Sequence, residues 1–98
     1  MRAQFKLGDF AIIAIVGGPL HVRVISTHKN QASYLSEKGE IGYCSVQSLL
    51  DVDGYLLHCE RMADEWTGRE FRERSMAAKK PFTPTAVWEE TFQRACEP

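Results

Sequence analysis

The side chains best suited to metal binding or nucleophilic chemistry in this 98-residue sequence are His21, His28, His58, Cys44, Cys59 and Cys96. No two of them lie at the spacing of a zinc site, and the adjacent His58 and Cys59 would point in different directions on a helix. Cys44 and Cys59 lie on apolar stripes, which favours inert buried thiols. An odd cysteine count without a C-x-x-C motif is typical of reduced thiols in a cytoplasmic protein. The sequence therefore predicts no catalytic residue, no metal site and no cofactor.

Basic side chains concentrate in one segment that contains Arg69, Arg72, Arg74, Lys79 and Lys80, with Phe71 among them. Such a segment suits contact with phosphates or with an acidic partner, and Phe71 suits stacking on a base. Glutamates interleave with the basic residues, which is typical of a solvated helix. The formal net charge of −1 also argues against a protein dedicated to nucleic acid, because phosphate binding draws on a basic excess. Nucleic-acid contact through Arg69–Lys80, with Arg69, Phe71 and Arg72 as candidates, is an alternative that is not favoured.

The elements that must position these residues begin with short strands separated by tight turns. The turns are Gly17-Gly18-Pro19, Lys29-Asn30 and Lys38-Gly39, because glycine and asparagine tolerate positive φ and proline cannot donate to a sheet. The strands are expected at residues 9–16, 20–27, 32–36, 40–46 and 50–52. Five short strands in about 50 residues predict a small, strongly bent antiparallel barrel or two packed sheets.

The first expected strand is apolar on both faces. One face carries Ala11, Ile13 and Ile15, and alternate residues from Phe10 to Val16 make the other. A strand of this kind is expected to be covered on both faces, and burying three Ala and Ile side chains contributes roughly 3–5 kcal/mol. One face can fill the barrel, and the other needs either the C-terminal helices or a second copy of the protein. Ala11, Ile13 and Ile15 are therefore a candidate interaction surface.

From residue 55 onward the apolar positions recur at helical spacing, which predicts two or three helices. The expected boundaries are an N-cap at Asp53, a stop at Gly68, a second helix over residues 69–79 and an N-cap at Thr83. The fold class is thus α+β, with a barrel over residues 1–53 and a helical extension over 54–98 in one cooperative domain. No apolar run approaches the roughly 20 residues of a membrane span, so no membrane association is expected.

The opening strands resemble the small YodC-like family of SH3-like barrels. The resemblance rests on Phe5-Lys6-x-Gly8-Asp9, on the Gly17-Gly18-Pro19 turn and on the short turn within residues 45–52. It covers residues 5–53 and implies an SH3-like five-stranded antiparallel β-barrel, but no activity, because that family has none assigned. The sequence departs from the family at residues 33–36, where Ser-Tyr-Leu-Ser replaces a Cys-x-Trp-Phe element.

A more distant similarity links Gly8-Asp9 and residues 45–52 to the plasmid-borne type of dihydrofolate reductase, a tetramer with a central active pore. The pore of that enzyme depends on a Val-Gln-Ile-Tyr run. The corresponding residues here read Val-Gln-Ser-Leu over 46–49, so the isoleucine and tyrosine that carry the chemistry are missing.

These observations favour a small non-enzymatic binding module in the cytoplasm that forms a homodimer or binds another protein. Three alternatives stay open besides. The chain could contact nucleic acid through residues 69–80, it could be a mobile-element protein that inhibits a host complex, or it could be an enzyme whose active site forms only on oligomerisation.

Overall fold

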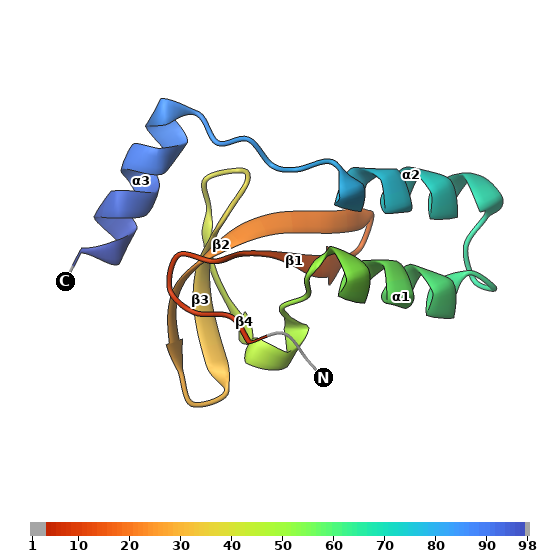
Figure 1. Ribbon diagram of the computed structural model, residues 1–98, viewed down its shortest axis with the longest axis horizontal. Coiled ribbons are helices and arrows are strands. Elements are labelled where there is room, and N and C mark those ends of the chain that lie inside the picture. Colours follow the sequence, from red (N-terminus) through yellow and green to blue (C-terminus); the bar gives the residue numbers. More distant parts are fainter. Residues whose placement is uncertain (1–3, 98) are drawn as a thin grey trace.

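The computed structural model describes residues 4–97, which fold into an α+β arrangement of one antiparallel sheet followed by three helices (Figure 1). The strands are β1 (Phe10–Ile15), β2 (Gly18–His28), β3 (Gln31–Ser36) and β4 (Ile41–Ser45). A 3-10 turn, η1 (Val46–Ser48), leads to helices α1 (Val52–Met62), α2 (Gly68–Lys79) and α3 (Ala86–Cys96). The α+β class and the first four expected strands are therefore confirmed, with small shifts at their ends, and the helical extension contains three helices where two or three were expected.

The strands follow each other in the order β1-β2-β3-β4, and each neighbouring pair is antiparallel. The three predicted turns join them. Gly17, at φ +98°, and Gly39, at φ +82°, adopt the left-handed conformation that other residues rarely reach. A register shift between Val24 and Ser26 marks a bulge in β2, and a bulge of this kind bends a strand.

The fifth strand expected at residues 50–52 is not present, and the sheet is open instead of closing into a barrel. Leu50 alone pairs with Ile12, through reciprocal backbone hydrogen bonds of 2.7 and 2.8 Å. The next residue, Asp51, accepts a 2.7 Å hydrogen bond from the Gly54 N–H and so caps α1. Because the helix begins at Val52, only one residue is left to extend the ladder.

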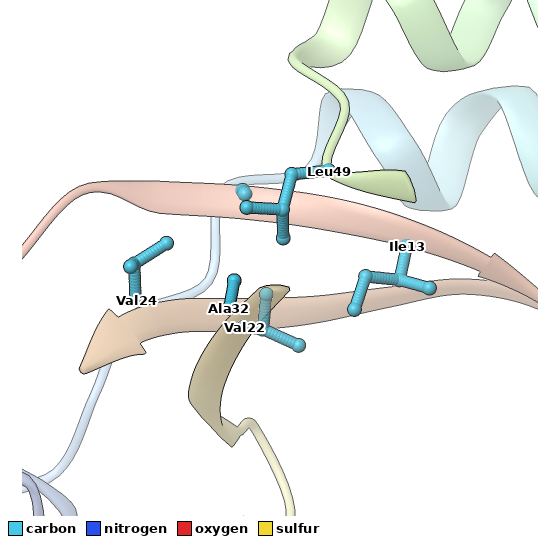
Figure 2. Packing of buried hydrophobic residues seen from close by; sticks show 6 residues of the cluster. Ile13, Val22, Val24, Ala32 and Leu49 are labelled. Carbon is cyan, nitrogen blue, oxygen red and sulfur yellow. The ribbon is translucent and has the colours of Figure 1, made fainter. Parts of the chain in front are cut away.

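The two faces of β1 are both covered within one chain, by different parts of it. Ala11 and Ile13 point to the inner face of the bent sheet, in a core cluster completed by Val22, Val24, Ala32 and Leu49 (Figure 2). Ile12 points outward against Tyr55, Cys59 and Ala78 of α1 and α2. The helical extension therefore packs in cis, and Ala11 and Ile13 belong to the core where an outward surface had been expected. Ile15 is 44% exposed.

The helix boundaries differ from the expected ones because other polar side chains cap the helices. Asp51 caps α1 in place of Asp53. Thr67 and Glu70 form a capping box that makes Gly68 the first residue of α2, where a helix stop had been expected. Thr85 caps α3 in place of Thr83, through a 3.1 Å bond from the Trp88 N–H to its hydroxyl. None of the helices in residues 4–97 has both the length and the apolar character that a bilayer crossing requires.

Helix α3 covers the outer face of β2 and β3. Trp88 and Phe92 pack against Ile25 and Leu35, and the Trp88 Nε1–H donates a 2.7 Å hydrogen bond to the Ser36 carbonyl. The guanidinium of Arg23 lies 4.3 Å from the ring centre of Phe92, within the range of a cation–π contact, and its Nε–H donates to the Gly8 carbonyl. The outer face of the sheet is thus covered over β1 by α1 and α2, and over β2 and β3 by α3.

Candidate interaction surfaces

Strand β4 is the last strand of the sheet, and the described residues place no further strand beside it. Its backbone is bonded to β3 on one side only. The Ser36 N–H donates to the Glu40 carbonyl, and the Val46 N–H donates to the Asn30 carbonyl, each at 2.8 Å. These two bonds frame β4 and fix which of its residues turn their backbone toward β3.

Hydrogen-bonded and non-bonded pairs alternate along an antiparallel ladder. The framing bonds involve Glu40 and Val46, the even-numbered residues that flank β4, so Gly42 and Cys44 direct their backbone N–H and C=O groups toward β3 in this register. Ile41, Tyr43 and Ser45 then direct their N–H groups away from β3, to the open edge. A row of unpaired backbone donors and acceptors of this kind is a template for pairing with another strand.

The side chains of β4 extend this open edge into an exposed apolar surface. Ile41 is 56% exposed and Tyr43 is 76% exposed, and both lie on the outer face of the sheet. No residue from Ile41 to Ser45 is charged or proline, and no bulge interrupts the pairing of β4 with β3. Charged residues, proline and bulges are the features that normally protect an edge strand. We define Ile41–Ser45, with its free backbone groups and these two side chains, as the β4 edge.

The inner face of β4 is closed, in contrast. The Tyr34 ring lies directly over Gly42, where any Cβ would collide with it. Burial raises the pKa of the Tyr34 hydroxyl and also the pKa of the Cys44 thiol. A raised pKa keeps the thiol protonated at neutral pH and so lowers its reactivity. A hollow of about 230 Å³ opens at this end of the sheet, lined in part by Ile15, Leu20 and Ile41.

A second apolar hollow of about 370 Å³ lies on the outer side of β1, where the segment after α2 crosses the sheet. Its walls include Phe10, Ile12, Leu50, Ala78 and Phe82. His21 forms part of its rim, and the His21 Nε2 lies 3.1 Å from the Ala77 carbonyl near the end of α2. This ring links β2 to the helix, which is a structural role.

The basic residues of α2 do not form one binding surface. Arg74 is only 19% exposed, pairs with Glu70 at 3.3 Å and lies 4.3 Å from the ring centre of Trp66. Phe71 is partly buried against the cluster beneath α1 and α2, so part of its ring is used in packing. Arg69 pairs with Glu73 at 2.9 Å. Arg72 is exposed, and the predicted Glu70–Arg74 pair is present.

The titratable groups of the helical layer serve packing as well. Burial, together with a smaller contribution from the nearby Cys59 thiol, raises the pKa of Tyr55 to about 12. Cys59 is fully buried, and all three cysteines are free thiols. No three His, Cys, Asp or Glu side chains within residues 4–97 gather closely enough to hold a metal ion.

Sequence reasoning did not single out Ile41 and Tyr43. Both lie in a segment correctly expected to be a strand, and the alternation of Ile41, Tyr43 and Ser45 with Gly42 and Cys44 defines its two faces. The available signal was a strand without charge or proline. The position of β4 at the sheet edge is a feature of the strand order, since Leu50 pairs with Ile12 of β1 and not with β4.

Comparisons with protein-family models, with curated proteins and with solved structures found no match to this chain.

Proposed function

We propose that this protein is a small non-enzymatic interaction module that binds through the β4 edge. The observation that carries the proposal is a strand whose outward backbone groups have no partner within residues 4–97, with exposed Ile41 and Tyr43 and without the charged residues or proline that protect such edges. Strand addition to a sheet edge is a recurrent mode of protein recognition, in which main-chain hydrogen bonds give affinity and alternate side chains give specificity.

Several side chains that could do chemistry have packing or capping roles, which supports a binding function over catalysis. Tyr55 and Cys59 lie under the helical layer, His21 contacts the end of α2, and Glu70 belongs to the capping box. We also propose that the arrangement is SH3-like, because the bent sheet is followed by a 3-10 turn and by the Leu50–Ile12 bridge.

Site-specific photo-crosslinking tests the proposed function. A benzophenone amino acid replaces Tyr43 in one variant and Met76 in a matched one, because Met76 is 64% exposed on α2 and belongs to no strand. Both variants are irradiated in cells that express the protein. We expect a defined crosslinked species from position 43 and none of that size from position 76. Equal or absent crosslinking at the two positions would contradict the proposed function.

A further inference from the structure

We infer that the occupant of the β4 edge is the β4 edge of a second copy, paired antiparallel across a two-fold axis that passes through Tyr43. This inference rests on the proposed function and specifies its partner. It starts from the three residues that direct backbone groups outward, Ile41, Tyr43 and Ser45, which are symmetric about Tyr43.

The backbone pattern selects this register. A hydrogen-bonded pair needs an outward-facing residue on both strands, so outward residues must face outward residues. With the axis at Tyr43, the two Tyr43 backbones exchange a reciprocal pair of N–H to C=O bonds. The Ser45 N–H of each copy then reaches the Ile41 carbonyl of the other. Moving the axis to Gly42 or Cys44 removes the central Tyr43 pair and leaves fewer outward residues facing each other.

Charge supports a self-pair in this register. Any residue on a two-fold axis meets its own copy, so a charge at the centre of β4 would face an equal charge, which is unfavourable. Residues 41–45 carry no charge. The nearest charged residue, Glu40, would lie opposite Val46 of the second copy, and Lys38 opposite Ser48, so no two like charges are opposed across the pair.

The side chains also complement each other. Outer-face Tyr43 of one copy would lie beside Tyr43 of the other, and Ile41 beside Ser45. Directly opposed side chains in an antiparallel pair are close enough for aromatic pairs to stabilise the sheet. Tyr43 is 76% exposed in the single chain, so pairing can bury much of its ring. The two four-stranded sheets would join into one continuous sheet with α3 of each copy on the same outer side.

The strength of the pair follows from its size. One five-residue strand, about 17 Å long, buries less than the roughly 1,200–2,000 Å² of a stable interface. The dimer is therefore expected to be weak and to form at high protein concentration.

Sedimentation velocity of the full chain over a wide concentration range tests the pairing. Wild type is expected to shift from monomer to dimer as concentration rises. Tyr43→Lys places two ammonium groups together at the axis and is expected to weaken dimerisation on the order of tenfold or more. Met76→Lys makes the same kind of change on exposed α2 and is expected to leave the association unchanged. Circular dichroism checks that both variants keep the fold.

A disulfide experiment reports the register directly. In a Cys44→Ser, Cys96→Ser background, Tyr43→Cys places two thiols at the axis, where a hydrogen-bonded antiparallel pair holds Cα atoms about 5.5 Å apart, within disulfide range. We expect rapid oxidation to a covalent dimer, and slower oxidation of Met76→Cys in the same background.

The outcomes separate this inference from the proposed function. A dimer that Tyr43→Lys leaves intact overturns the pairing, and so does a chain that stays monomeric at every concentration. If that monomer still gives a crosslink from position 43 to another protein, the β4 edge binds a different partner and the proposed function stands. If position 43 gives no crosslink either, both fail.

Discussion

The first and last strands of the sheet, β1 and β4, differ in how much of their surface is covered by other parts of the chain. β1 has the inner core on one face, α1 and α2 on the other, and Leu50 beside it at Ile12. β4 has the inner core on one face only, and its outer face and free edge meet solvent. Helices α1 and α2 therefore cover the β1 end of the sheet, and the β4 end is left exposed to solvent.

The largest expected effect comes from truncating Ile12 in β1, and the same truncation of Ile41 in β4 is the comparison. Ile12 is 3% exposed beneath α1 and α2, so Ile12→Ala removes buried methyl groups and is expected to lower the free energy of unfolding by about 2–5 kcal/mol. Ile41 is 56% exposed, so Ile41→Ala is expected to change it by less than about 0.5 kcal/mol in dilute protein. Urea denaturation measures both. Similar losses in the two variants would contradict the asymmetry.

Alkaline pH tests how firmly the helical layer covers β1. The pKa of Tyr55 is raised from 10.0 to about 12, so the native state holds this proton more tightly than the unfolded chain does. The stabilising contribution is complete below pH 10 and is lost as the pH rises from 10 to 12, by about 2–3 kcal/mol. Unfolding free energies at a series of pH values measure it. Tyr55→Phe is expected to lack this loss, whereas Tyr43→Phe on β4 should retain it.

A glycine substitution tests the closed inner face of β4. Gly42→Ala drives a Cβ into the Tyr34 ring, and such overpacking is expected to lower the free energy of unfolding by about 1–3 kcal/mol. A double-mutant cycle with Tyr34→Ala measures the contact, because removing the ring relieves the collision. Strictly additive losses would show that Tyr34 does not lie over Gly42.

The smallest effect concerns the start of α2, far from both strand edges. Backbone and side-chain hydrogen bonds with Thr67 lower the pKa of Glu70. Its stabilising contribution is therefore present above the ordinary glutamate pKa and is lost as the pH falls through the lowered value. Glu70→Gln is expected to make stability slightly less dependent on acid pH, as measured by acid titration of the helical circular dichroism signal. An unchanged acid profile would exclude this linkage.

Periodicity and turn chemistry were sufficient to predict the strands and helices. The alternation in residues 20–27 and the turn residues Asn30 and Gly39 are local signals, and the structure confirms the two hairpins. The positive φ of the first hairpin falls on Lys29 and not on Asn30. Helix ends were less predictable, since Asp51 and Asp53 are both suitable N-cap residues and only Asp51 caps α1 in the structure.

The candidate surfaces were predictable only in part, because they depend on tertiary contacts. The sequence indicates that β1 is apolar on both faces, but the direction in which Ala11 and Ile13 point depends on the bend of the sheet. The exposure of Ile41 and Tyr43 depends on what lies beyond β4, which no pattern within residues 41–45 records. Phe71 likewise matches a stacking side chain in sequence, and the fold packs it, partly buried, against the cluster around Ile12.

The most direct test of an open, self-pairing β4 edge is amide hydrogen exchange along this strand, measured by NMR at low and high protein concentration. In dilute protein the Gly42 and Cys44 amides should be protected by β3, and the Tyr43 and Ser45 amides should exchange rapidly. At high concentration the Tyr43 and Ser45 amides should gain protection. Protection of Tyr43 in dilute protein, or rapid exchange of Tyr43 at every concentration, would contradict this account.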